Sequence, residues 1–415
     1  AHHGKMAQEP PPWLDETFLA SAILGEDGNK VTIVNYSTSP AVAAGNNYTS
    51  HLSRVRVEYI VDGSDHQSIS LIIKAPITKG VMVEMTQGCN FFSKEPKIYS
   101  ELLPQLNRKL GEEFGTKCFN CSVENVLVLK DLNKEGFIMC DRYNQLDYSH
   151  CECVFKTLAK FHASSVACYR DNPDLINAVG EDFMSKSSNI TKEEMEFWLK
   201  SCVKTVVEIV SGIDECRPAA EMFLRRVDDA NIAESVEKVS NPKKKGLNVL
   251  NHGDLWINNI LFKHADSGDV VDVKFVDFQL AKFASPLVDL LYFMWTSANQ
   301  DVREDRQQEL YDVYLRTLND SLEQLGCPER LSQDEFRQDI TAAADWAIAV
   351  ICSTLPMMVC DADNILDMEE VTREDFTSTQ PNETIRKMHS GKYYRTLLPN
   401  LMRQFYDWIS LANKS

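Results

Sequence analysis

The sequence predicts an α+β protein with a small antiparallel-sheet lobe followed by a larger, mainly helical lobe. Strand-like patterns fill the first 130 residues, whereas helix caps and helical spacing of apolar residues dominate after about residue 148. The length of 415 residues suits one large two-lobed unit as well as two or three domains. We expect the first lobe to span residues 7–131 and the second to span residues 132–415.

Strands and one helix are predicted in the first lobe. Valine and tyrosine alternate with arginine and glutamate over residues 55–61, which is the period of two of a half-buried antiparallel strand. The β-branched run 68–74 (SISLIIK) predicts a second strand, which ends on a lysine. A helix is expected from about residue 91 to 110, with its first turn marked by Pro96. Further strands are expected around residues 123–129 and 136–140.

Three helices of the second lobe are predicted from capping boxes, in which a serine or threonine precedes a glutamate by three residues. These pairs are Ser149–Glu152, Thr191–Glu194 and Ser332–Glu335. The lysine-rich run 241–246 contains Pro and Gly, which break regular structure, so it predicts a surface loop. A short strand-like stretch follows at 270–275.

The charge balance excludes some classes of partner. The chain has 61 acidic and 43 basic side chains, a formal net charge of −18 and a pI near 5.0. Such an acidic protein is not expected to bind nucleic acid or to anchor to membranes through basic residues. No obligate protein partner is inferred. One local site can still bind an anionic nucleotide against this overall charge.

The N-terminus and the cysteines predict a cytoplasmic protein. Residues 1–6 (AHHGKM) resemble an expression scar that ends at the expected native start, Met6, and no hydrophobic signal region follows. The longest apolar run, residues 346–360, is interrupted by Pro356 and is shorter than the roughly 20 residues that cross a bilayer. The 12 cysteines are expected to be mostly buried free thiols, as in a reducing compartment.

One polar motif is the strongest chemical signal in the sequence. It reads H-x-D-x-x-x-x-N over residues 252–259 and continues as D-F at the end of a later apolar strand. Phosphoryl transfer needs a group that positions the acceptor hydroxyl and oxygen ligands that hold Mg²⁺. We expect Asp254 to accept the hydroxyl proton, and Asn259 and Asp277 to bind the metal ion. The alternative is a polar turn in which Asp254 only caps and Asn259 only fills a turn position.

The run "LNHGDLWINNILF…VKFVDFQLAKFASPLVDLLYF" resembles the ecdysteroid kinase-like proteins, a branch of the choline kinase and aminoglycoside phosphotransferase superfamily. Weaker matches extend the resemblance over nearly the whole chain. They are "GNNYTS", "LIIKAP", "FFSKEPKIYSELLP", "VLVLKDL" and "LAKFHASS". The resemblance implies a protein-kinase-like bilobal fold that uses ATP and Mg²⁺.

The resemblance also implies how the nucleotide phosphates are held. Lys74, at the end of its strand, is expected to contact the α- and β-phosphates, and Glu95 to pair with it and keep it in place. Asn47, Tyr48 and Ser50 belong to the expected phosphate loop, where asparagine tolerates left-handed backbone and amides can meet phosphate. An ordinary hairpin turn is the alternative for this loop.

Other residues are expected to support the nucleotide and the catalytic loop, residues 252–259. The backbone of Leu129 to Asp131, where the lobes should join, is a candidate for hydrogen bonds to the adenine edge. His252 is expected to brace the catalytic loop, and Asp289 to do the same from the next helix.

Two features argue for a small-molecule acceptor rather than a protein. Gly253 stands where a protein kinase usually has an arginine that receives an activation-loop phosphate. Only about eight residues separate Gln279 from the helix expected near Leu287, too few for a platform that holds a peptide.

The helical half, from about residue 185 onward, is expected to build the acceptor site. It is rich in bulky apolar residues, among them Phe293, Met294, Trp295, Trp346, Met357 and Met358. An apolar slot suits an ecdysteroid or similar lipophilic alcohol, which the resemblance favours. The acidic residues Asp361, Asp363, Asp367, Glu369 and Glu370 would instead suit the cation of choline, ethanolamine or an aminoglycoside. A non-catalytic protein that binds a lipophilic ligand is the remaining alternative.

Overall fold

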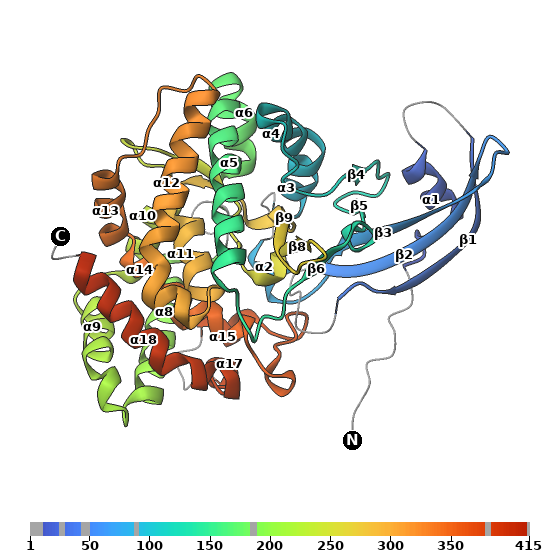
Figure 1. The fold of residues 1–415 in the computed structure, drawn as a ribbon. Helices are drawn as coiled ribbons and strands as arrows, with labels where there is room; N and C mark the ends of the chain where they lie inside the picture. Colours follow the sequence, from blue (N-terminus) through green and yellow to red (C-terminus); the bar gives the residue numbers. More distant parts are fainter. Residues whose placement is uncertain are drawn as a thin grey trace.

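The structure is a computed structural model that describes residues 11–24, 30–42, 50–86, 91–182, 189–377 and 383–412. The expected expression scar and two residues of the expected phosphate loop, Asn47 and Tyr48, lie outside the described residues. Figure 1 shows a curved antiparallel sheet at one end of the molecule and a block of helices at the other. The predicted α+β class, with a small antiparallel-sheet lobe and a larger, mainly helical lobe, is confirmed.

The first lobe contains a five-stranded sheet in the order β1-β2-β3-β5-β4, with every neighbouring pair antiparallel. Its strands are β1 (Val31–Pro40), β2 (Ser50–Val61), β3 (His66–Pro76), β4 (Cys118–Phe119) and β5 (Leu127–Lys130). Helix α1 (Glu16–Ile23) packs on β1. The predicted alternation in β2 is confirmed, because Val55 and Val57 are buried while Arg56 and Glu58 are exposed.

The strand expected around residues 123–129 begins later than predicted, at Leu127. Residues 123–126 form a turn instead, in which the Val126 N–H donates to the Val123 carbonyl over 3.3 Å and Asn125 takes a positive φ of 59°. Asparagine tolerates this left-handed conformation better than most residues, so the chain turns here and the strand begins only afterwards.

The helix expected over 91–110 is present with these bounds, but Pro96 does not mark its first turn as predicted. It consists of α3 (Phe91–Lys97), a π-helical turn (Ile98–Leu102) and α4 (Leu103–Leu110), after a short α2 (Val81–Met85). Pro96 lies inside α3 rather than in its first turn. Proline lacks an N–H and crowds the preceding turn, and the ladder widens directly after it.

The second lobe is built around α5 (Tyr148–Asp171), which packs along α12 (Gln307–Gln324) (Figure 1). The capping boxes at Thr191 and Ser332 are confirmed. The one at Ser149 was wrong, because Asp147 caps α5 and accepts the His150 N–H. The Asp147 carboxylate, two residues before Ser149, therefore satisfies a free amide of the first turn.

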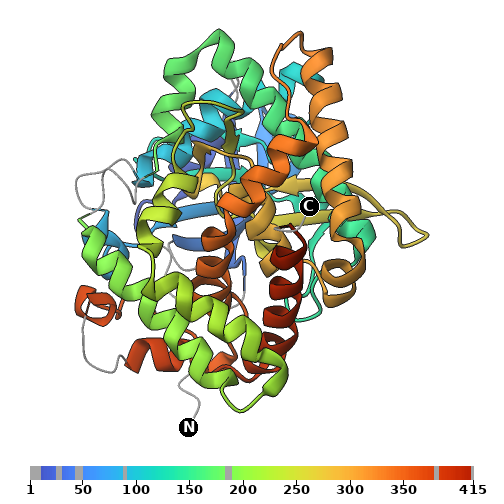
Figure 2. The ribbon, with the colours of Figure 1, turned by 90° about the vertical axis from the view of Figure 1, so that its left-hand side faces the viewer.

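Further helices complete this lobe around the core. They are α6 (Pro173–Gly180), α8 (Lys192–Val210), α9 (Arg217–Asp228), α10 (Ile232–Ser240), α11 (Leu287–Thr296), α13 (Gln333–Ala342), α14 (Ala344–Ala349), α15 (Leu355–Met358), α16 (Arg373–Thr377), α17 (Glu383–Met388) and α18 (Lys392–Ala412). Figure 2 views the molecule from this lobe, with the sheet of the first lobe behind the helices. In the described part of the chain no single helix is long and apolar enough to cross a membrane; one bent pair, Gln333–Ala342 with Ala344–Met358, passes by length and composition.

Two small sheets in the second lobe bring the halves of the polar motif together. One pairs β7 (Val249–Asn251) with β10 (Lys282–Ala284), and the other has the order β6 (Phe137–Met139), β8 (Ile260–His264) and β9 (Val270–Phe275). Residues 252–259 connect β7 to β8, and residues 276–281 connect β9 to β10. Both connections therefore lie between the same two sheets.

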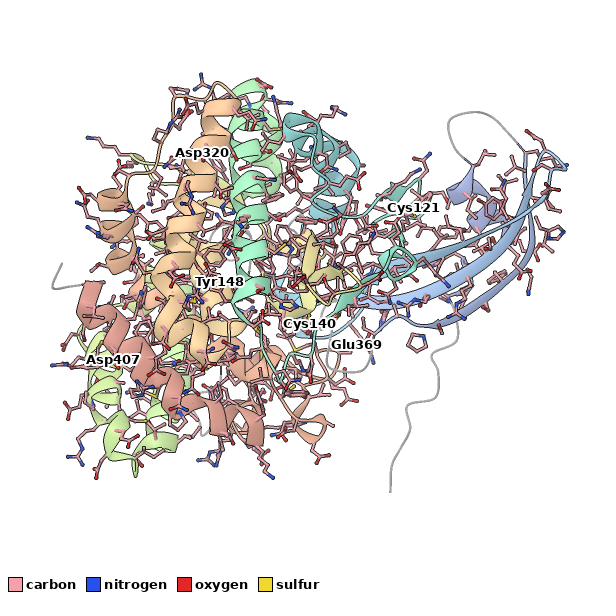
Figure 3. The ribbon with its side chains drawn as sticks, in the orientation of Figure 1. Cys121, Cys140, Tyr148, Asp320, Glu369 and Asp407 are labelled. Atoms are coloured by element: carbon pink, nitrogen blue, oxygen red, sulfur yellow. The ribbon has the colours of Figure 1, made fainter. Side chains whose placement is uncertain are left out.

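The lobes contact each other beyond the link at residues 131 and 132. The Val81 N–H donates to the Val371 carbonyl over 3.0 Å, and His51 lies 3.5 Å from Glu369. Figure 3 shows Glu369 beside the region where the lobes meet. Buried Ile98 and Leu129 of the first lobe belong to the same apolar cluster as Phe155 of α5. The lobe boundary at 131/132 stays a prediction.

Candidate active site

The backbone of the catalytic loop is anchored by Asp289, a fully buried residue in the first turn of α11. Its carboxylate accepts the N–H groups of His252 and Gly253 over 2.6 and 2.8 Å. The His162 ring lies 3.2 Å from the same carboxylate and 2.7 Å from the Tyr314 hydroxyl. Burial lowers the pKa of His162 although Asp289 opposes this shift, so the ring acts as a neutral core partner.

The His252 ring joins the two halves of the motif. Its Nε2 lies 2.9 Å from the carbonyl of Val276, the residue before Asp277. The Val276 N–H in turn donates to the Asn259 carbonyl over 3.0 Å. Burial lowers the pKa of His252, as expected for a ring that braces the loop rather than exchanges protons.

Gly253 lets the catalytic loop approach the segment after Asp277. Its φ is +83°, and an added Cβ would lie 1.9 Å from the Leu280 carbonyl oxygen. A side chain at this position is therefore excluded by backbone, whatever its chemistry. This contact explains physically why no arginine stands beside Asp254.

The Asp254 carboxylate is held from two sides. The Tyr292 hydroxyl, from α11, donates to its Oδ1 over 2.5 Å, and the Asn259 side-chain amide donates to its Oδ2 over 2.9 Å. Burial, with the nearby charge of Asp277, raises the pKa of Asp254 to about 7. A fixed carboxylate of raised basicity has the geometry of a group that accepts a hydroxyl proton.

Lys74, Glu95 and Asp277 meet at the junction of the lobes. The Lys74 ammonium lies 2.7 Å from Glu95 Oε2 and 2.7 Å from Asp277 Oδ1. Glu95 Oε1 accepts the Phe278 N–H over 3.1 Å, which ties α3 to the segment after Asp277. Burial lowers the pKa of Lys74, but Asp277 and Glu95 outweigh it and hold that pKa above its ordinary value. The expected Lys74–Glu95 pair is present in the structure.

The side-chain oxygen atoms of Asn259 and Asp277 are suitable ligands for a Mg²⁺ ion. The Asn259 amide group points its nitrogen at Asp254, which leaves Oδ1 as the atom that can bind a cation. Asp277 adopts a left-handed backbone conformation with φ 69° and ψ 66°, a strained conformation for a non-glycine residue and one that recurs at active sites. An amide oxygen and a carboxylate suit Mg²⁺, which prefers hard oxygen ligands and keeps several waters.

Ser50, Leu129 and Asp131, also expected to bind the nucleotide, have different surroundings in the structure. Ser50, at the start of β2, lines a small cavity of about 10 Å³ together with Lys74 and Glu95. Leu129 faces Ile72 and Cys118 across the sheet. The Asp131 N–H donates to the Ser70 carbonyl over 3.1 Å, and its buried carboxylate pairs with Arg54. The Asp131 amide is thus already engaged, which does not favour it as an adenine contact.

A second cavity of about 430 Å³ opens beside Asp254. Six methionines line it: Met82, Met85, Met195, Met357, Met358 and Met368. Trp346 also lines it, as expected for the acceptor site, whereas Phe293, Met294 and Trp295 are fully buried in α11. Residues of α2 and Phe91 line this cavity together with residues after 185.

Tyr292→Phe should lower kcat by about tenfold and leave the KM for ATP unchanged, because it removes a hydrogen bond to a charged group that orients Asp254. Steady-state kinetics of ADP formation with a saturating acceptor measure both constants. Tyr311→Phe is the matched control, since the buried Tyr311 hydroxyl has no partner among the described residues. Equal kinetics for the two variants would contradict a role of Tyr292 in orienting Asp254.

Four residues at or beside these cavities were not predicted from the sequence: Lys94, Asp182, Lys282 and Tyr292. For Tyr292 a signal was present, since it lies three residues after Asp289 on a helix and residues so spaced share a face. The others come together only through long-range contacts.

Comparisons with solved structures show kinases of similar size. They are an ethanolamine kinase from Plasmodium vivax (13% identity, 87% of this chain and 81% of that chain, TM-score 0.42), a choline kinase from Cryptosporidium parvum Iowa II (12%, 91% and 89%, 0.39) and an aminoglycoside phosphotransferase from Alicyclobacillus acidocaldarius (11%, 99% and 99%, 0.48). At these TM-scores the likeness carries no argument about function.

No curated protein matches the sequence significantly. The ecdysteroid kinase-like family, in contrast, matches residues 44–327, which is more than half of the chain and includes the whole polar motif. The chain therefore belongs to the ecdysteroid kinase-like family, whose members are small-molecule kinases.

Proposed function

We propose that this protein is an ATP- and Mg²⁺-dependent O-kinase of the cytoplasm whose acceptor is a lipophilic alcohol, an ecdysteroid or a similar hydroxylated compound. One observation carries the proposal: Asp254 and Asp277 line the same methionine-rich cavity of about 430 Å³. That volume lies in the range of small-molecule sites, and apolar walls with few polar groups suit a hydroxylated lipophile.

Each residue of the site has a part in the proposed reaction. Asp254, held by Tyr292 and Asn259, orients the acceptor hydroxyl and accepts its proton as the oxygen attacks the terminal phosphate of ATP. Lys74, kept in place by Glu95, binds the other phosphates. Asn259 and Asp277 would hold Mg²⁺, which neutralises charge on the phosphates when bound.

The charges around the cavity favour a neutral acceptor over a cationic one. Choline-like cations are held by aromatic rings and carboxylates, and aminoglycosides by acidic clefts. Apart from the two aspartates of the motif, the carboxylates at this cavity are instead paired with cations of the chain: Asp182 with Lys282, Glu194 with Arg373 and Glu237 with Lys192. Of the acidic residues after 360, Glu369 contacts His51 rather than the cavity.

Lys74→Met should lower kcat/KM for ATP by about ten- to a hundredfold, because it removes a charge-assisted contact to phosphate. Kinetics with varied ATP and fixed acceptor measure this. Lys160→Met, which removes a partly exposed lysine paired with Glu112, is the control and should leave kcat/KM unchanged. Equal loss in the two variants would argue that Lys74 does not contact ATP.

The proposed function is tested by ADP formation with a panel of acceptors: steroid alcohols, choline, ethanolamine and an aminoglycoside. We expect turnover with steroid alcohols and little with the cations. Turnover restricted to a cationic acceptor would contradict the proposal. A rise in melting temperature with steroid alcohols but none with Mg-ATP, and no ADP formation, would favour the non-catalytic alternative.

A further inference from the structure

A row of polar and aromatic side chains runs along one wall of the apolar cavity. It starts at Asp254, which accepts the Tyr292 hydroxyl, and the Tyr292 ring stacks on Trp346 with centroids 6.3 Å apart. The Lys282 ammonium lies 5.6 Å from the centre of the Trp346 ring and 3.0 Å from Asp182 Oδ1. All five residues line the cavity, and we call them the polar row.

The polar row ends, on the side away from Asp254, in the ion pair between Lys282 and Asp182, which is buried beside the apolar cavity. Lys282 and Asp182 are each only 7% exposed. Burying an ion pair costs free energy unless both charged groups also make further hydrogen bonds. An ammonium has three N–H donors, and within the described residues Lys282 donates one hydrogen bond, to Asp182. The lysine therefore has donor capacity that an oxygen atom of a ligand in the cavity would use.

A second lysine also joins the two backbone segments that carry the pair. Lys94, a buried residue of α3, donates to the Glu181 carbonyl over 2.6 Å and to the Ala281 carbonyl over 3.0 Å. Glu181 and Ala281 are the chain neighbours of Asp182 and Lys282. Lys94 thus already joins the same two segments, so the Lys282–Asp182 pair can contact a ligand while Lys94 holds them.

We propose that the Lys282–Asp182 pair binds a second oxygen-bearing group of the acceptor and so selects which hydroxyl reaches Asp254. This inference rests on the proposed function, because it places the phosphorylated hydroxyl at Asp254. The acceptor class that it names is a rigid lipophile with two separated oxygen functions, such as a diol or a hydroxyketone. Trp346 and Tyr292, between the two ends of the row, offer ring faces along which such a skeleton packs.

The test compares one steroid diol with its two mono-alcohols, so that only an oxygen atom differs. The probes are 5α-androstane-3β,17β-diol, 5α-androstan-3β-ol and 5α-androstan-17β-ol, each with Mg-ATP. The variant is Lys282→Met with Asp182→Asn, which removes both charges together and leaves no lone buried ion. The matched control is Lys243→Met with Asp339→Asn, a partly buried pair that does not line the cavity. If the double variant does not fold, Lys282→Gln with Asp182→Asn replaces it, because this pair also removes both charges and keeps polar side chains of similar size.

We expect the wild type to have a kcat/KM for the diol about tenfold or more above that for either mono-alcohol, which is the effect of one hydrogen bond to a charged group. The double variant should lose this preference, and the control pair should retain it. A wild type without the preference, or a double variant that retains it, would overturn the inference.

Binding separates this inference from the proposed function. The increase in melting temperature that each steroid causes is measured without ATP. If the diol stabilises the wild type more than the mono-alcohols do, and the double variant shows no such difference, the inference holds even where no steroid is phosphorylated. If all three steroids are phosphorylated with equal kcat/KM by both proteins, the proposed function holds and the inference fails.

Discussion

Asp254→Asn should lower phosphoryl transfer by about 10²–10⁴-fold, the usual contribution of a positioned acid or base, while the fold is retained. The amide cannot accept the hydroxyl proton, although it fills the same space beside Tyr292 and Asn259. Initial rates of ADP formation with a steroid alcohol measure the loss. The melting temperature should stay equal or rise, because the substitution removes a charge whose burial is unfavourable.

The control for this variant is Asp171→Asn. Asp171 lies at the end of α5 with a side chain that is 66% exposed, and it pairs with Lys109 far from the motif. The Asp171→Asn variant should form ADP at the same rate as the wild type. Near-normal rates in Asp254→Asn would contradict the role assigned to this residue.

Gly253→Ala should destabilise the protein by about 3–5 kcal/mol and abolish activity. The added Cβ would lie 1.9 Å from the Leu280 carbonyl oxygen, so one of the two backbones must move. Because Gly253 directly precedes Asp254, this movement also displaces the carboxylate. The unfolding free energy is measured by urea titration, with ADP formation as the second readout.

Gly268→Ala is a matched control for the backbone conformation. Gly268 also has a positive φ, +90°, but an added Cβ there would meet nothing within 4 Å. It should cost only about 1–2 kcal/mol, the strain of a side chain in left-handed backbone. Equal losses in the two variants would show that the contact with Leu280 does not matter.

Those parts of the site that depend on local pattern could be predicted from the sequence. Asp254, Asn259 and Asp277 lie within one short stretch, and the strands on either side are strongly apolar. Lys74 and Glu95 needed the resemblance, since a lysine at a strand end and a glutamate on a helix do not by themselves predict contact. The structure places both beside Asp277.

Long-range packing decided what the sequence could not predict. Asp182 and Lys282 are 100 residues apart, and no periodicity links a loop after α6 to a strand after the D-F motif. Likewise, the position of Met368 in the wall of the apolar cavity depends on a C-terminal segment that crosses to α2, where the Val371 carbonyl accepts the Val81 N–H.

Two other predictions that were wrong concern the N-terminal cap of α5 and the position of Pro96 in its helix. Asp147 caps α5 instead of Ser149, because an aspartate, also a strong N-cap residue, stands two residues before the predicted Ser149–Glu152 pair. Pro96 was taken as a helix start, although a proline can also lie inside a helix whose next turn widens. Both errors concern a position at or near the start of a helix, and neither changes the predicted fold.

The most direct test of the central claim is mass spectrometry of a lipid extract incubated with ATP and Mg²⁺ and either the wild type or Asp254→Asn. We expect one or more lipophilic alcohols to become heavier by one phosphoryl group with the wild type, and none with the variant. Phosphorylated products that form equally with both proteins, or that are confined to choline-like or aminoglycoside cations, would contradict the account.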